Sequence, residues 1–273
     1  MNGPVRIVFV GPHRWRAFAV FNGNAFPAGV RQIVDACGSR LALLLLHTVT
    51  MRNAVERDTA GFKEAIQRQR EDMERAIRSR PDLTSVAVYN GLAHLAEMHS
   101  FLNALKSFLD VYSKLIGKLI NPKNDWSFGK AKVDGRELSG GRLINALRNC
   151  SKQASLKNLA DLTLAHSQAW ITEAVKYRDQ LSHRSDLDNM RCMQLPLHHS
   201  APHVNFDELS KPEMPNGQEL ERYVERLLKN LVEYLRESIR MLPNVDCTLI
   251  SPEKGLCPEF CGKVDSAFSP AKP

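Results

Sequence analysis

Several motifs that identify common classes of enzyme are missing from this sequence. No pair of its six cysteines has Cys-x-x-Cys spacing, so a zinc-ribbon signature is absent. The early glycines are not followed by Gly-Lys-Ser/Thr, which excludes a Walker-type phosphate loop. His94, Glu97 and His99 match neither zinc-peptidase motif, because Met98 occupies the position that the spacing would require for a ligand.

A long hydrophobic run is also missing. Leu41–Leu46 is the most apolar stretch, and it is too short to span a bilayer. Val5–Val10 is apolar but short, and Arg14 and Arg16 follow it, which does not fit a signal peptide. We therefore expect a soluble, cytoplasmic protein with no membrane partner.

The cysteines leave one arrangement in which a metal could bind. Cys257 and Cys261 are separated by three residues, and zinc there would need two further ligands. Cys247 and one of three histidines are the candidates: His198, His199 and His203. Reduced cytosolic thiols explain the same cysteines without a metal, so we expect no metal and no cofactor.

The overall composition is that of a soluble globular protein, with 43% hydrophobic and 25% charged residues. Its basic residues exceed its acidic ones, which gives a formal net charge of +7 and a pI near 9.1. A positive balance favours acidic partners such as nucleic acid.

Hydrophobic periodicity predicts an all-α fold, in which the helices could form a bundle, with an N-terminal extension and a Pro- and Cys-containing C-terminal tail. Apolar residues recur at helical spacing over several stretches, which predict helices at 30–80, 84–120, 142–150, 156–185 and 218–241. Residues 121–141 and 186–217 are expected to be loops. The expected organisation has four parts: an extension with a short hairpin (1–29), a helical segment packed on the bundle (30–83), the bundle itself (84–242) and the tail (243–273).

Two features of these segments have alternative interpretations. In the basic, glycine-rich loop 121–141, Trp126 and Phe128 could stack on bases, or they could anchor the loop to the core; we favour anchoring. His99 lies on the apolar stripe of its helix, where a hydrogen-bonded core histidine is favoured over a metal ligand.

The most specific pattern in the chain is Tyr177-Arg178-Asp179-Gln180-Leu181-Ser182-His183, near the end of a helical segment. Asp179 and His183 are one helical turn apart and point the same way, because each residue adds about 100°. Arg178 and Ser182 form a second such pair. Arg178 and His183 are about 140° apart, so a cleft or a second copy of the chain would be needed to bring both onto one small target.

These residue types suit phosphodiester cleavage in RNA. A histidine can move a proton near neutral pH, and an acid one turn away can fix its tautomer. An arginine offers forked donors to a phosphate and keeps its charge. Attack by the RNA 2′-hydroxyl then needs neither a metal nor a protein nucleophile.

Arg178, Asp179 and His183 also match Arg-polar-x-x-x-His, the signature of the HEPN superfamily, which the segment 84–242 resembles. The resemblance implies a mostly antiparallel helical bundle that dimerises so that two motifs form one cleft. It implies metal-independent ribonuclease activity in toxin–antitoxin, phage-defence or RNA-processing systems, with RNA and an antitoxin or regulatory protein as partners. Some members carry a modified Tyr two residues after the His, where this chain has Ser185.

We therefore predict Arg178, Asp179 and His183 as catalytic residues and Ser182, Lys106 and Asn103 as substrate contacts. In this hypothesis Arg178 binds the scissile phosphate, His183 acts as general base or acid, and Asp179 orients His183. Two alternatives stay open. The chain could be a non-catalytic HEPN-like module that binds RNA, a nucleotide or a protein, or a helical scaffold in which Arg178 and Asp179 form surface ion pairs.

Overall fold

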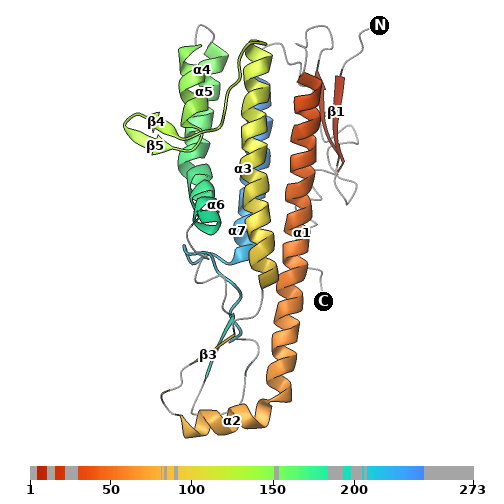
Figure 1. Cartoon of the computed structure of the whole chain (residues 1–273), viewed down its shortest axis with the longest axis vertical. Coiled ribbons are helices and arrows are strands. Elements are labelled where there is room, and N and C mark those ends of the chain that lie inside the picture. The colour runs from red at the N-terminus through yellow and green to blue at the C-terminus, as the bar shows by residue number, and fades with distance from the viewer. Residues whose placement is uncertain are drawn as a thin grey trace. The chain divides into compact units, whose positions relative to one another are not determined.

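The computed structural model describes residues 5–10, 16–21, 30–80, 82, 85–88, 92–150, 154–183, 193–197, 205 and 208–242. Most of these residues are helical, as the all-α prediction requires (Figure 1). The chain divides into two compact units. Unit 1 comprises Met1–Leu46, Phe101–Arg178 and Glu225–Pro273, and unit 2 comprises His47–Ser100 and Asp179–Val224.

Seven α-helices are found in the described ranges: α1 (Val30–Arg68), α2 (Arg70–Ser79), α3 (Leu92–Ile120), α4 (Gly141–Asn149), α5 (Ala154–His166), α6 (Thr172–His183) and α7 (Leu220–Met241). A π-helical turn, Ser167–Ile171, joins α5 to α6 without a break in the helical path. Four helices, α1, α3, α6 and α7, each contribute residues to both units.

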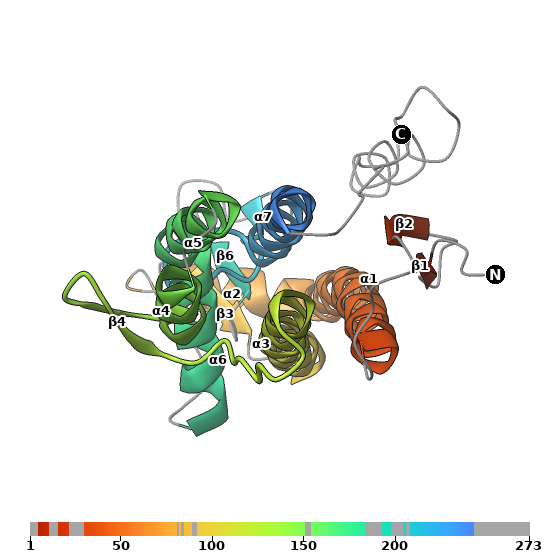
Figure 2. The ribbon, with the colours of Figure 1, turned by 90° about the horizontal axis from the view of Figure 1, so that it is seen from above.

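Unit 1 is built on α3 and α7, which lie side by side between α1 and the pair α4–α5 (Figures 1 and 2). The Tyr112 hydroxyl of α3 is hydrogen-bonded to Ser238 Oγ of α7 at 2.6 Å, in a fully buried position. Thr163 of α5 and Tyr234 of α7 are hydrogen-bonded at 3.2 Å, and burial raises the pKa of Tyr234 to about 12. In these two pairs, buried hydroxyl groups satisfy one another within a largely apolar core.

A β-hairpin leaves unit 1 between α3 and α4 (Figure 2). Strand β4 (Ala131–Val133) pairs antiparallel with β5 (Arg136–Leu138). Asp134 and Gly135 form the turn with φ values of 50° and 81°, the left-handed pair that a two-residue hairpin loop requires. The hairpin packs its inner side, Val133 and Leu138, on Ile144 of α4.

The hairpin corrects the prediction that residues 121–141 form a loop without regular structure. Asp-Gly is a hairpin signal that was present in the sequence, but each strand has only three residues and so leaves almost no alternation to detect.

Unit 2 combines the second half of α1, α2, the first turns of α3 and a small sheet. Its described apolar cluster joins Phe62 and Ile66 of α1 to Leu195, with Met73 and Leu209 packed against them. The helical path changes direction between α1 and α2 at Gln69, and α2 runs across the end of α1 (Figure 1). In the sheet, β3 (Ser85–Val88) pairs antiparallel with β6 (Met193–Pro196).

Strand β3 corrects the predicted start of the helix at 84–120. The helix begins at Leu92, because residues Ser85–Val88 pair with a strand that is distant in sequence. The short run Ser-Val-Ala-Val, with its two β-branched valines, has strand propensity that the helical periodicity downstream concealed.

In the N-terminal segment, β1 (Val5–Val10) pairs antiparallel with β2 (Arg16–Phe21). The predicted tail 243–273 lies outside the described residues. One helical segment among those described, Gln32–Arg68, is long and apolar enough to cross a membrane by length and composition alone. Core helices of soluble proteins pass the same test, so this is weak evidence for a span.

Candidate functional site

The motif lies on α6, which follows the π turn. A π turn holds one residue more per turn than an α-helix and is frequent at functional sites. Trp170 and Ile171 of this turn are buried, and the Trp170 indole N–H donates to His166 Nδ1 over 2.8 Å. The turn is therefore anchored in the core of unit 1, which fixes the start of the motif helix.

Tyr177 is buried, whereas Arg178 and Asp179 are half-buried. Arg178 is a residue of unit 1, and the residues from Asp179 onward belong to unit 2. His183 is the last residue of α6, and its side chain lies outside what the structure describes.

Within unit 2, Ser182 meets a histidine from another helix. His99 Nε2 of α3 and Ser182 Oγ of α6 are hydrogen-bonded at 3.1 Å, and both residues are half-buried. His99 was expected to be a hydrogen-bonded core residue. It is hydrogen-bonded, but the fully buried histidine of α3 is His94, which is 0% exposed.

The difference follows from the direction of the buried face of α3. The face includes His94, Met98 and Phe101, each almost fully buried, which recur at steps of four and three. Their stripe runs beside the one drawn through His99, so His99 lies at the margin of the core. Because this stripe contains a histidine and a methionine, its hydrophobic periodicity is weaker than that of the neighbouring leucine-rich stripe, which the sequence indicated instead.

Two further histidines of unit 2 pair with carboxylates, and no pattern in the sequence indicated these pairs. His47 Nδ1 lies 2.8 Å from Glu97 Oε2, which also accepts a 2.8 Å hydrogen bond from Thr50. Burial raises the pKa of Glu97, but the hydrogen bonds from His47 and Thr50, with the His47 charge, hold this pKa below its usual value. His94 Nδ1 lies 3.3 Å from Asp58 Oδ2.

These pairs join α1 to α3. The spacing of the paired residues along the chain does not indicate that they lie close together. In the described ranges, no group of three or more His, Cys, Asp or Glu residues could hold a metal ion. The cysteines and histidines of the zinc arrangement considered from the sequence (Cys247, Cys257, Cys261, His198, His199, His203) lie outside these ranges.

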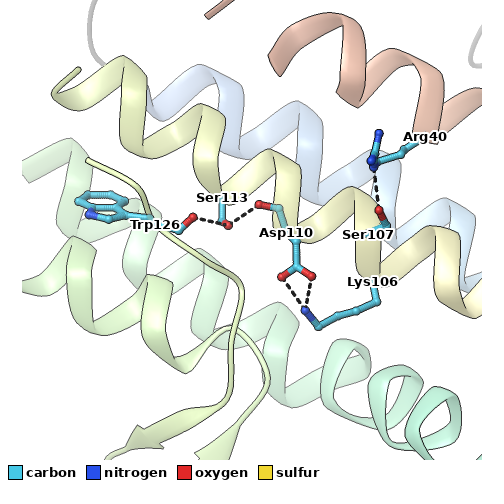
Figure 3. A network of polar contacts seen from close by, with 6 residues as sticks. All are labelled: Arg40, Lys106, Ser107, Asp110, Ser113 and Trp126. Carbon is cyan, nitrogen blue, oxygen red and sulfur yellow. Dashed lines mark hydrogen bonds and ion pairs between the residues drawn. The ribbon is translucent and has the colours of Figure 1, made fainter. Parts of the chain in front are cut away.

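Lys106 and Asn103, the other candidate substrate contacts, are residues of unit 1. Lys106 Nζ lies 2.5 Å and 2.6 Å from the two carboxylate oxygens of Asp110, one turn along α3, and its side chain is 17% exposed (Figure 3). Asn103 is exposed. The ion pair balances the charge of Lys106, so a phosphate would have to compete with Asp110 for it.

The same stretch of α3 holds the 121–141 segment in place (Figure 3). The Ser113 hydroxyl donates to the Asp110 carbonyl over 2.8 Å and approaches the Trp126 carbonyl at 3.3 Å. The Trp126 ring lies against Gly117, where an added Cβ would come within 3.1 Å of it. Phe128 is 0% exposed. These positions favour the anchoring interpretation of both aromatic residues over base stacking.

Comparison with protein-family models, with curated proteins and with solved structures finds no match to this chain.

Proposed function

We propose that this protein is a metal-independent endoribonuclease of HEPN type, acting as a cytoplasmic homodimer in a toxin–antitoxin or phage-defence setting. The observation that carries the proposal is the position of Arg178, Asp179 and His183 in the last turns of one helix. Arg178 and Asp179 are half-buried there. Half-burial strengthens charge–phosphate interactions, because the effective dielectric constant is lower there than in water.

In the proposed reaction, the Arg178 guanidinium binds the scissile phosphate and stabilises the charge that develops on its oxygens. His183 removes the proton of the 2′-hydroxyl, whose oxygen attacks phosphorus. Asp179, one turn before His183, orients the imidazole. The products are a 2′,3′-cyclic phosphate and a 5′-hydroxyl. An antitoxin or regulatory protein would restrain the enzyme by covering this helix end.

The test is cleavage of total RNA by the purified protein in excess chelator, with mapping of the RNA ends. We expect wild type to leave 2′,3′-cyclic phosphates, and Arg178→Ala and His183→Ala each to lose about 10²–10⁴-fold in rate. Lys176→Ala is the matched control, because it removes a positive charge at an exposed position of the same helix.

Equal cleavage by all four proteins would assign the activity to a contaminant or to another site. Wild type that binds RNA but does not cleave it would instead favour a non-catalytic RNA-binding module. A protein that neither binds nor cleaves RNA would favour the scaffold interpretation.

A further inference from the structure

The hydrogen bond between His99 and Ser182 brings a second histidine to the motif helix. The bond is 3.1 Å long, lies within unit 2 and joins α3 to α6. Ser182 immediately precedes His183 in the chain. Both bonded residues are half-buried, so the pair lies at the margin of the core and not within it.

The partner of His99 distinguishes it from the other described histidines of unit 2. His47 and His94 each lie beside a carboxylate, at 2.8 Å and 3.3 Å. A hydroxyl is neutral and can donate or accept, so it accommodates both the neutral and the charged imidazole. Among the described histidines of unit 2, His99 is therefore the one whose hydrogen bond reaches the motif helix.

Cleavage by 2′-hydroxyl attack needs two proton transfers, one from the 2′-oxygen and one to the departing 5′-oxygen. The motif supplies one histidine for the first of these transfers. Within one copy of the chain, the Arg-x-x-x-x-His pattern supplies no donor for the second transfer. In the proposed homodimer the second copy's His183 is the competing donor, and that assignment predicts full activity for His99→Ala.

We propose that His99 is the general acid of the reaction, an inference that rests on the proposed ribonuclease function. The bond from the 2′-oxygen to phosphorus forms while the bond from phosphorus to the 5′-oxygen breaks. The 2′-hydroxyl proton passes to His183, and the Nε2 proton of His99 passes to the 5′-oxygen. Ser182 is a positioning residue that holds Nε2 until the 5′-oxygen takes its place, and His99 is then reprotonated by solvent.

The competing explanation is that the bond only fastens α6 to α3. A glutamine at position 99 distinguishes the two roles, because it can replace the hydrogen bond to Ser182 but not the proton donor. His99→Gln keeps an amide N–H that can reach Ser182, but it has no proton to give. His99→Ala removes both the bond and the acid.

The experiment compares two RNA oligonucleotides that differ at one atom, with oxygen or sulfur as the bridging 5′ leaving atom. A thiol has a pKa of about 8.5, far below that of an alcohol, so a thiolate departs without an acid. Single-turnover rates are measured for wild type, His99→Ala, His99→Gln, Ser182→Ala and His183→Ala, each shown to be folded by its melting temperature.

We expect both His99 variants to lose about 10²–10⁴-fold on the oxygen substrate and to cleave the sulfur substrate within a few-fold of wild type. His183→Ala should stay slow on both substrates, because it lacks the base. Ser182→Ala should lose only a few-fold.

Three outcomes would overturn the inference while the ribonuclease function stands. His99→Gln could match wild type on the oxygen substrate, which would show that His99 only links α6 to α3 and is not a proton donor. Both His99 variants could be equally slow on both substrates. His99→Ala could be fully active. Wild type that cleaves neither substrate would overturn the ribonuclease function, and the assignment of His99 with it.

Discussion

Replacing Phe128 by alanine tests whether this residue anchors the segment between α3 and α4. Its side chain is 0% exposed, and its ring lies against Gly140, where an added Cβ would be 2.6 Å from the ring. Gly140 precedes α4, and its carbonyl accepts a 3.0 Å hydrogen bond from the Ile144 N–H, which holds its backbone against moving into the void left by the ring. We therefore expect the cavity to stay largely open.

Removing a buried phenylalanine ring costs about 3–5 kcal/mol when the surroundings do not collapse. Phe128→Leu keeps most of the buried carbon and should cost about 1–2 kcal/mol. With a urea m-value of about 2–3 kcal/mol/M, Phe128→Ala should lower the unfolding midpoint by about 1–2 M. Both tryptophans of the described ranges, Trp126 and Trp170, belong to unit 1, so tryptophan fluorescence follows that unit.

Lys123→Ala, at an exposed position of the same segment, is the control and should leave the midpoint unchanged. The reasoning is refuted if Phe128→Ala unfolds at the same urea concentration as Lys123→Ala. If the variant also bound RNA less tightly, base stacking would be the better explanation of this side chain.

Two further predictions concern unit stability. Gly141→Ala should destabilise unit 1 by at least about 2 kcal/mol, because an added Cβ would lie 2.4 Å from the Ala131 carbonyl oxygen. Gly61 lies in α1, and an added Cβ would have nothing within 4 Å of it, so Gly61→Ala should instead stabilise the protein by about 0.5–1 kcal/mol. Urea titrations in which both substitutions changed the free energy of unfolding in the same direction would contradict this. Burial lowers the pKa of His166, against the opposing effect of Glu233 and Glu237, so the unfolded chain binds its proton more readily than the folded protein does. The free energy of unfolding of unit 1 should therefore fall as the pH decreases through 6.5. It should fall less steeply in His166→Gln, whose amide oxygen can still accept the hydrogen bond from Trp170. Equal slopes of stability against pH in the two proteins would exclude His166 as the cause.

The parts of the fold that depend on local signals could be predicted from the sequence. The last helix was expected at 218–241 and is observed at Leu220–Met241, because its apolar and charged faces are well separated and Pro243 follows it. The short helix at 142–150 is observed at Gly141–Asn149 for the same reason.

What could not be predicted depends on residues that are far apart in the chain. Ser85–Val88 forms a strand because Met193–Pro196 pairs with it, and no local pattern records that partner. The His94–Asp58 and His47–Glu97 pairs likewise arise where two helices meet. The bond from His99 to Ser182 spans 83 residues, so the sequence could identify the motif but not the neighbour that α3 brings to it. The relation to HEPN proteins and the antiparallel arrangement of the bundle stay predictions.

The π turn at Ser167–Ile171 determines which way the motif faces. The π turn contains one residue more than a regular α-helical turn, and deleting one residue from a helix rotates all later residues by about 100° relative to the earlier ones. Without the additional residue, either Ala174, Val175 and Tyr177 would leave the core or α5 would have to rotate instead. The helical phase of Arg178 is thus set by one additional residue upstream, in a turn that Trp170 fixes to the core. Insertions and deletions between α5 and α6 should be much less tolerated than substitutions at the exposed positions of the same turn, Gln168 and Ala169.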